Sequence, residues 1–513
     1  MKNNKGDQLE KREIRTHYSG VIIFAAKLIT VATGIVFALI VANSLPQTEY
    51  GILGIFNLMV PYFTILSGAV SFWTMRFVAR SAEGATKTGL VANAALAAIA
   101  TLIYLALLPI VAPAFGLNNY IIVYLIMAMQ VVEIYLITVL ESSLQGRQPE
   151  FIGLGLLIGE ALKVVFCYLF VVNRQMGLLG VALSIIAAYA IKVGFYFKIV
   201  FSELKQKLMF SYIREWVKGS AFNVYSIIGD RIAAILFLLI GWYGTEIATS
   251  YYYATSQIAN IIGYSTFLAF ALTPKLLAEN KIEEATVSLK FVLMFAIPMA
   301  AGVLALPGSY MIFLKESGEY VAAVPVLMIL AIDALILTVS SVFTWVLYGV
   351  ERVDEKATIP FREMIKSKIF IAFSFPYIHA AITLPAAFYA LTVFAHGDPL
   401  QVAIYATGIN LIGHVVMFFV LSYVLRKAAK LKIPWSSIGK YALSSVVMAA
   451  ILLLTHPSGR LSTLIFTAIG GVAYITILLA IDRDTRTLLR NSVDTVKTRV
   501  SRRQRIENET TAV

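Results

Sequence analysis

The sequence predicts an all-α polytopic membrane protein with about fourteen transmembrane helices, arranged as two six-helix lobes (6+6) followed by two C-terminal helices. Three observations support this fold class. Hydrophobic residues make up 59% of the 513 residues and charged residues only 14%, whereas about a quarter of a soluble protein is charged. Long apolar runs recur from residue 18 to residue 481. Basic residues gather in alternate loops between these runs, which is typical of membrane proteins.

A helix needs about 20 mostly apolar residues to cross the hydrocarbon core of a bilayer. The runs that meet this requirement lie near 18–42, 51–75, 89–113, 119–140, 151–172, 177–200, 220–240, 248–272, 287–307, 322–347, 369–395, 401–425, 437–455 and 461–481. A polar, basic stretch from Ser202 to Lys218 interrupts the series after the sixth run. Very short loops separate the third and the last pairs of runs, which leaves counts of thirteen and fourteen open.

Lysine and arginine residues set the expected orientation, because cytoplasmic loops carry an excess of them. The loops on one side hold only Arg174, Lys315 and Arg460. The loops on the other side hold Arg76, Arg80, Lys87, Arg147, Lys205, Lys207, Arg214, Lys218, Lys275, Lys281, Arg352, Lys356, Arg362, Lys366, Lys368, Arg426, Lys427, Lys430 and Lys432. We therefore expect a protein of the cell membrane whose two termini both lie in the cytoplasm.

An internal repeat divides the chain. The pair Thr48-Glu49 after the first run corresponds to Thr245-Glu246 after the seventh, and the sequence LQG at 144–146 corresponds to LYG at 347–349. Six runs against six indicate a duplication, and duplicated halves are typical of transporters with a site between them near the midplane. We expect an N-lobe at 1–200, a linker at 201–219, a C-lobe at 220–425, helices 13 and 14 at 426–481, and a basic tail at 482–513.

Three motifs and the 6+6+2 plan carry a family resemblance. They are LPQTEYGILGIFNLM after the first helix, the LQG turn after the fourth, and Thr273-Pro274-Lys275 at the end of the eighth. Over residues 15 to about 480 the chain resembles the polysaccharide-transport branch of the multidrug/oligosaccharidyl-lipid/polysaccharide exporter superfamily. The resemblance implies a flippase that moves an oligosaccharide linked to polyprenyl or dolichyl (pyro)phosphate from the inner to the outer leaflet by alternating access. Its expected partners are that carrier, membrane lipids and glycan-assembly proteins, and we expect a monomer.

Ionisable residues far from helix ends are the first candidates for the site, because a charge at a helix centre costs roughly 2.5–3.5 kcal/mol. An anionic head group needs positive charge to replace its hydration. Lys27 and Arg231 occupy neighbouring positions in the two repeats and are the first candidates for substrate binding, followed by Lys163 and Lys192. The alternative is structural ion pairing. Glu160 and Lys163 are spaced i, i+3 and could pair with each other, and we expect Glu133 and Asp333 each to pair with some other residue.

Polar stripes add further candidates. Tyr253, Gln257 and Asn260 fall on one face of the eighth helix, where a tyrosine with amides suits a sugar; interhelical hydrogen bonding is the alternative. The resemblance to lipid II flippases implies a sodium site, in which Asp230 and Asn410 would take part. Coupling to Na⁺ or H⁺ therefore stays open, and no organic cofactor or metal site is expected.

The sequence argues against several functions and leaves one alternative open. The chain has no Gly-x-x-x-x-Gly-Lys-Ser/Thr loop and no His-Glu-x-x-His motif. We therefore expect that the protein is not an enzyme. Its basic residues lie in short loops rather than in a patch, which argues against nucleic acid. The single cysteine, Cys167, lies in an apolar run and indicates core packing. A multidrug or small-cation exporter of the same superfamily remains the alternative function.

Overall fold

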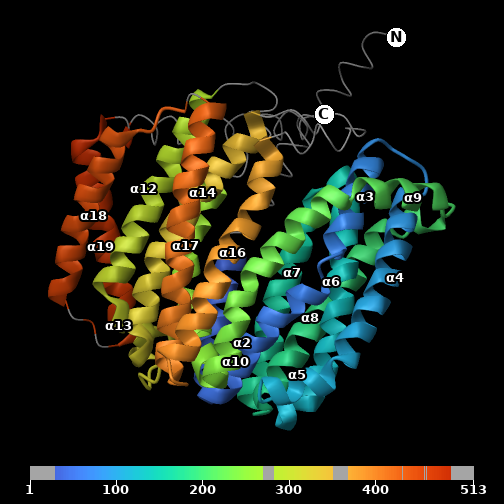
Figure 1. Cartoon of the computed structure of the whole chain (residues 1–513), viewed down its shortest axis with the longest axis horizontal. Coiled ribbons are helices and arrows are strands. Elements are labelled where there is room, and N and C mark those ends of the chain that lie inside the picture. The colour runs from blue at the N-terminus through green and yellow to red at the C-terminus, as the bar shows by residue number, and fades with distance from the viewer. Residues whose placement is uncertain are drawn as a thin grey trace, which may run out of the picture. The chain divides into compact units, whose positions relative to one another are not determined.

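The structure, a computed structural model, describes residues 29–269, 282–350, 368–429, 431–455, 457, 459–483 and 485–486. Nearly all regular structure in these residues is helical (Figure 1). The longer helices are Ile29–Ser44, α2 (Gln47–Phe63), α3 (Ser67–Ala79), α4 (Ala85–Ala106), α5 (Leu108–Ala114), α6 (Ile121–Arg147), α7 (Glu150–Cys167), α8 (Gly177–Val200), α9 (Phe210–Gly219), α10 (Ala221–Gly263), α12 (Glu283–Ala305), α13 (Pro307–Leu314), α14 (Val324–Val350), α16 (Lys368–Val393), α17 (Pro399–Ala428), α18 (Trp435–Thr455) and α19 (Arg460–Ile481).

The chain is a multi-pass membrane protein. Eleven helices in the described residues are long and apolar enough to cross a bilayer, or twelve if α2 and α3 together form one span. This count includes the stretch Val224–Ala269 once, although it covers two expected spans, and leaves out Ile29–Ser44, which is short. A total of fourteen helices is therefore not confirmed, although the expected all-α membrane architecture is.

Three expected spans differ from the observed helices. The expected span 51–75 is divided into α2 and α3, which meet at a bend of 56°. Pro61 lies in the last turn of α2, and proline removes a backbone hydrogen bond and kinks a helix. By contrast, the two expected spans 220–240 and 248–272 follow each other with no loop. A single residue, Thr245, breaks α10 with φ 64° and ψ −173°.

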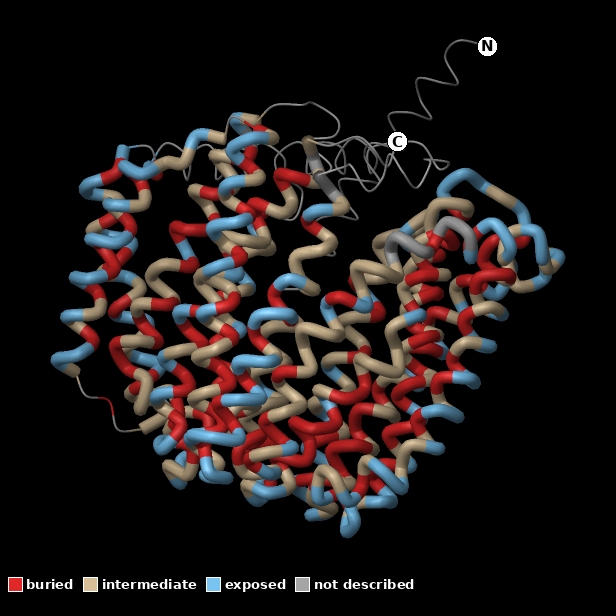
Figure 2. The backbone as a smooth tube through the Cα atoms, in the orientation of Figure 1, coloured by how far each residue is buried: buried red, intermediate tan, exposed pale blue. Residues whose placement is uncertain are grey.

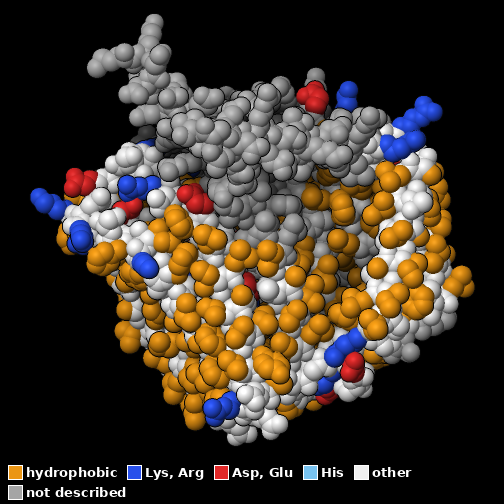
Figure 3. Space-filling model, turned by 180° about the vertical axis from the view of Figure 1, so that it is seen from behind, with side chains coloured by type: hydrophobic (Ala, Val, Ile, Leu, Met, Phe, Trp, Pro, Cys, Tyr) orange, Lys and Arg blue, Asp and Glu red, His pale blue; other side chains and the backbone are white. Residues whose placement is uncertain are grey.

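The described chain forms two compact units. The larger comprises residues 29–258, 314–330 and 368–419, and the smaller comprises 259–269, 282–313, 331–350 and the described residues from 420 onwards. The expected C-lobe contributes to both units, so the division into lobes stays a prediction. In the larger unit, buried residues concentrate along α6 and α8 and between α10, α16 and α17 (Figure 2). On the face shown in Figure 3, hydrophobic side chains predominate and charged side chains gather near the edges.

In the smaller unit, α12, α18 and α19 pack together. Tyr474 of α19 donates a hydrogen bond to the Met294 carbonyl of α12, at 2.7 Å. The start of the C-terminal tail is fixed by Asp482, which is fully buried. Its carboxylate accepts hydrogen bonds from Lys440 Nζ at 2.9 Å and from Thr485 Oγ1 at 2.5 Å. Burial raises the pKa of the Asp482 carboxyl, but these hydrogen bonds outweigh burial, so the pKa lies below its usual range.

We expect Asp482→Asn to lower the stability of the protein at neutral pH. Because hydrogen bonds to a charged group contribute roughly 1.5–3 kcal/mol, the loss should be visible as a lower thermal unfolding midpoint. The low pKa in the folded state means that this stabilisation is present above the ordinary carboxyl pKa and is lost as the pH falls through the folded value. Asp482→Asn should therefore remove part of the acid-induced loss of stability, whereas Glu83→Gln, at an exposed position, should leave it unchanged. Identical pH profiles for all three proteins would refute this assignment.

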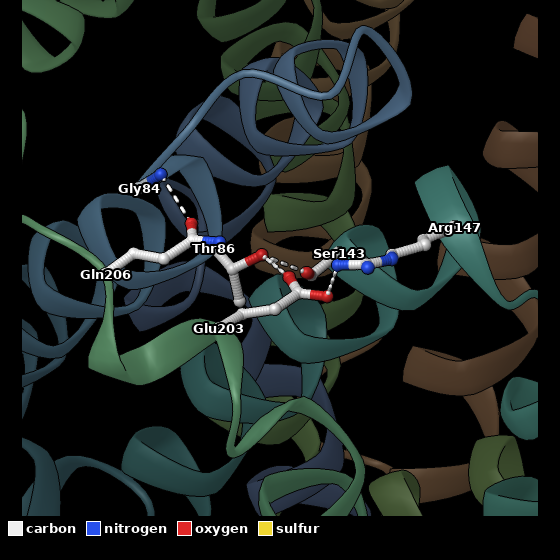
Figure 4. Close-up of polar contacts among 6 residues, drawn as sticks. All are labelled: Gly84, Thr86, Ser143, Arg147, Glu203 and Gln206. Atoms are coloured by element: carbon white, nitrogen blue, oxygen red, sulfur yellow. Dashed lines mark hydrogen bonds and ion pairs between the residues drawn. The ribbon is translucent and has the colours of Figure 1, made fainter.

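The linker before α9 is fastened to the ends of α4 and α6 (Figure 4). The Glu203 carboxylate accepts hydrogen bonds from Thr86 and pairs with Arg147. Thr86 also contacts Ser143, at 2.7 Å between the hydroxyl oxygens. The Gly84 amide donates to Gln206 Oε1 at 2.6 Å. Gly84 has φ 76°, and a Cβ atom there would lie 2.2 Å from the Lys207 carbonyl oxygen, so glycine is required.

We expect Glu203→Gln to release this linker. The neutral amide keeps the shape of the side chain but loses the ion pair with Arg147 and the strong acceptor for Thr86. A loss of about 1.5–3 kcal/mol should raise the rate of trypsin cleavage after Lys205 and Lys207 by roughly tenfold or more. Glu215→Gln on α9, where the side chain is exposed, is the matched control. Equal cleavage rates in the two variants would show that Glu203 does not hold the linker.

Candidate functional site

At one end of the larger unit, α2 contacts α10 and the segment at 314–320. We call this end the turn end and define it by residues 44–51, 115–120, 241–246 and 314–320. Here α2 lies against residues 246–253 of α10, after the break at Thr245. A Cβ atom added at Gly51 would lie 1.8 Å from the Glu246 carbonyl oxygen, and one added at Gly54 would lie 3.1 Å from Tyr253 Cβ. Two glycines one turn apart thus allow the two helices to approach at backbone distance.

Aromatic rings fill the contact beside these glycines. The Tyr50 side chain is 1% exposed, and its ring centroid lies 5.1 Å from that of Tyr253 and 5.5 Å from that of Tyr320. Asn57 Nδ2 donates to the Tyr253 hydroxyl at 3.1 Å. Asn57 itself is exposed and lies two turns from Tyr50. The tight part of the contact therefore ends near the middle of α2.

The turn between Ile29–Ser44 and α2 is held by the segment that precedes α14. Asn43 Nδ2 donates to the Leu314 carbonyl at 2.8 Å. Lys315 Nζ donates to the Leu45 carbonyl at 3.0 Å and pairs with Glu319. Lys315 is buried, so this basic residue of a turn-end loop links the segment before α14 to the turn that precedes α2.

The two acids of the internal repeat, Glu49 and Glu246, both lie at the turn end. Glu49 accepts a hydrogen bond from the Leu178 amide at 2.8 Å and so caps α8. Glu246 Oε2 lies 3.4 Å from the Cβ position of Gly116. Directly before Glu246, Thr245 has a positive φ that a β-branched residue rarely adopts, and such strain persists only where surrounding contacts impose it. The repeated Thr-Glu pair thus marks the sealed end of the unit.

Two ionisable residues, Asp230 and Arg231, lie halfway along the first part of α10. About ten residues separate them from the start of the helix, a rise of roughly 15 Å in a hydrocarbon core of about 30 Å. Gly229 faces α16, because a Cβ atom there would lie 2.6 Å from the Tyr377 ring, and Tyr377 donates to the Tyr225 carbonyl at 2.7 Å. Asp230 is exposed, and charges within spans face a cavity or the bundle interior rather than lipid.

Arg231 is partly buried. Its Nε is buried and has no hydrogen-bond partner among the described residues. The Tyr62 hydroxyl of α2, equally buried and without a partner there, interacts electrostatically with this guanidinium. A cation on α10 thus lies beside α2 at mid-depth with unused donor capacity.

The other predicted cations differ from Arg231. Lys27 lies outside the described residues. Lys163 pairs with Glu160 at 2.5 Å, as the i, i+3 spacing predicted, and Lys192 pairs with Glu141 at 2.8 Å. Lys192 is buried and also lies 5.7 Å from the centroid of the Tyr196 ring. Both lysines are neutralised by carboxylates in this conformation.

The predicted polar stripe is only partly buried. Tyr253 belongs to the turn-end contact, Gln257 is partly buried and Asn260 is exposed. Asn410 is buried, and its side-chain amide lies 3.3 Å from His414 Nδ1 on the same helix. The His414 ring stacks on that of His379 with centroids 4.6 Å apart. Asp230 interacts instead with Arg231 and Tyr377.

Sequence reasoning missed Asn57 and Tyr62, which lie on the side of α2 facing α10. Asn57 could have been identified from the sequence, because it is a lone amide in an apolar run, three residues after Gly54. It also misjudged Glu133. We expected a pairing partner for this residue, yet the buried Glu133 Oε2 has no hydrogen-bond partner in the described part of the chain.

No protein-family model matches this sequence, and no curated protein resembles it closely enough to count as a relative. Solved structures do match. The chain is similar to the lipid II flippase MurJ in an inward closed conformation, with a TM-score of 0.68 and 16% identity over 90% of this chain and 99% of that one. It is also similar to the MATE multidrug transporter DinF-BH in complex with R6G, with a TM-score of 0.59 and 12% identity over 80% of this chain and 95% of that one.

A third similar structure is an inward-facing multidrug resistance MATE family transporter of the MOP superfamily, with a TM-score of 0.57 and 12% identity over 80% of this chain and all of that one. At these identities the likeness concerns the fold. It agrees with the resemblance that the sequence motifs suggested. The chain has the fold of the MOP, or multidrug/oligosaccharidyl-lipid/polysaccharide exporter, superfamily.

Proposed function

We propose that this protein is a flippase that moves a lipid-linked oligosaccharide, carried on a polyprenyl or dolichyl phosphate or pyrophosphate, from the inner to the outer leaflet. The observation that carries the proposal is Arg231. It is a partly buried cation at mid-depth whose Nε has no acceptor among the described residues. A phosphate that leaves water needs charged donors to replace its hydration, and a guanidinium can donate two parallel hydrogen bonds to it.

The neighbouring side chains support a sugar-phosphate head group. Tyr62 offers an unused hydroxyl that interacts with Arg231. Further along α2, Asn57 donates a hydrogen bond to Tyr253 of α10. Gln257, one turn after Tyr253 in the same unit, is the next candidate for sugar binding; Asn260, predicted with it, belongs to the smaller unit. In this proposal Arg231 binds the phosphate and these side chains bind the sugars. Lys27 belongs to the same proposed set, whereas Lys163 and Lys192 would have to exchange their glutamate partners for the substrate.

The turn-end contact supports alternating access. The turn-end loops carry few basic residues, and the linker end, at residues 79–88, 143–148 and 200–219, carries many. By the positive-inside rule, the turn end faces outward, both termini face the cytoplasm, and this conformation is closed to the outside. Transport would then require α2 to separate from α10 at Gly51 and Gly54, since rocking of repeats about a central site is the usual mechanism of duplicated transporters.

A multidrug or small-cation exporter is the second candidate function. The exposed Asp230 at mid-depth favours it, because a carboxylate attracts cations. The same residue, with Asn410, would take part in Na⁺ or H⁺ coupling in either case. The two functions differ in the charge of the substrate, which makes them separable by experiment.

Purified protein in proteoliposomes tests the proposal. We expect the protein to translocate a fluorescent polyprenyl-diphosphate sugar and not to accumulate a cationic dye. Translocation is measured as the fraction of the labelled sugar that a membrane-impermeant quencher can reach. Dye transport without sugar translocation would favour the exporter and contradict the flippase.

A further inference from the structure

The N-terminal helices contain a buried carboxylate that is not part of the proposed substrate site. Glu133 lies on α6 and is 6% exposed, and its Oε2 atom has no hydrogen-bond partner among the described residues. Three residues earlier on the same helix, Gln130 is 8% exposed, and its Oε1 also has no donor there. Residues spaced i, i+3 lie on one face of a helix. Two buried oxygens without donors therefore occupy one face of α6, an arrangement that is rare in proteins.

The charges around Glu133 come from α6, α7 and α8. Lys192 of α8 pairs with Glu141 of α6, and Lys163 of α7 pairs with Glu160. Tyr189 of α8 interacts electrostatically with Glu160, Glu133 and Glu141, so the three carboxylates belong to one neighbourhood. Each lysine is matched by one glutamate, and Glu133 is the carboxylate left over.

The other helices packed against α6 do not neutralise this carboxylate. The charged residue of α3 is Arg76, in its last turn. The charged residue of α4 is Lys87, near its start, and that of α2 is Glu49, at the turn end. None of these helices brings a cation to the middle of α6. An isolated carboxylate is costly in a low-dielectric interior unless a positive charge neutralises it.

We propose that Glu133, with Gln130 beside it, is a binding site for a small monovalent cation, either H⁺ or Na⁺. Among the described residues one negative charge is left uncompensated, and it matches one positive charge. A divalent ion would need more carboxylates, and the described residues contain no group of three His, Cys, Asp or Glu side chains that could hold a metal. The site lies in the N-terminal helices, apart from Asp230 and Asn410, and it does not depend on which substrate the protein carries.

The first test is the thermal unfolding midpoint of the full-length protein in detergent, measured at acidic and alkaline pH in NaCl or in N-methylglucamine chloride. A bound cation stabilises the folded state by mass action, so we expect the wild-type midpoint to rise by about 2 °C or more with acidification if the ligand is H⁺. If it is Na⁺, the midpoint should rise with NaCl at alkaline pH. Glu133→Gln should abolish the response, and Glu215→Gln, at an exposed position on α9, should retain it. A response that persists in Glu133→Gln, or is absent from the wild type, overturns the proposal.

A second measurement needs no variant. Dicyclohexylcarbodiimide modifies protonated carboxyl groups in apolar surroundings, and mass spectrometry locates the adduct. We expect an adduct on Glu133 of the wild-type protein that decreases at least severalfold at alkaline pH, and in addition with NaCl if Na⁺ competes. A Glu133 that is never modified, or is modified independently of both pH and Na⁺, overturns the proposal even if Glu133→Gln fails to fold.

Discussion

Arg231→Gln should reduce translocation of a phosphate-linked sugar carrier by at least about tenfold. Removal of one partner of a buried charge-assisted hydrogen bond costs roughly 2–5 kcal/mol, and each 1.4 kcal/mol corresponds to about a tenfold change. Glutamine keeps hydrogen-bonding capacity but loses the positive charge. The measurement is the initial rate of translocation in proteoliposomes that contain equal amounts of folded protein.

Two further variants serve as controls for Arg231→Gln. Arg231→Lys keeps the charge but loses the planar fork of donors, so it should show an intermediate rate. Arg80→Gln removes an arginine at an exposed position after α3 and should leave the rate unchanged. If Arg231→Gln transports at the rate of the wild type, Arg231 does not bind the head group.

Gly51→Val should force the turn end apart. The added Cβ atom would lie 1.8 Å from the Glu246 carbonyl oxygen, and neither backbone can move without separating α2 from α10. Overpacking costs typically 1–3 kcal/mol, which should raise the population open at the turn end by roughly 5-fold to 100-fold. The measurement is labelling of Thr249→Cys, in a Cys167→Ser background, by a membrane-impermeant maleimide.

Thr249 suits this experiment because it is fully buried and packs against Gly54 and Gly241. We expect slow labelling in the parent and fast labelling after Gly51→Val. Gly471→Val on α19 is the matched control, since a Cβ atom there meets nothing within 4 Å. Labelling that stays slow after Gly51→Val, in protein that elutes as folded, would mean that the two helices can yield without opening.

Much of the fold could be predicted because bilayer thickness determines how long an apolar run must be. The expected span 177–200 coincides with α8, and several others agree within a few residues. The junctions were harder. The break at Thr245 is marked by neither glycine nor proline at that position, and the bend after α2 was hidden because Pro61 lies inside a continuous apolar run.

The site was less predictable, because its contacts join helices far apart in the sequence. Spacing alone identified the pair Glu160 and Lys163, since both residues lie on one helix. It could not identify Glu141 as the partner of Lys192, because that partner comes from another helix. It also could not distinguish Gly51, which meets a carbonyl oxygen, from Gly471, which meets nothing. The repeated Thr-Glu pair was found in the sequence, but its position at the sealed end required the structure.

The proposed role of Arg231 is tested most directly by changing the charge of the transported head group. Two carriers with the same lipid and the same sugar should be compared in proteoliposomes, one linked through phosphate and the other through a neutral ether. If Arg231 binds an anionic group at mid-depth, the phosphate-linked carrier is translocated and the ether-linked carrier is not. Equal rates for the two carriers would contradict the proposed role of Arg231 and the flippase mechanism that depends on it.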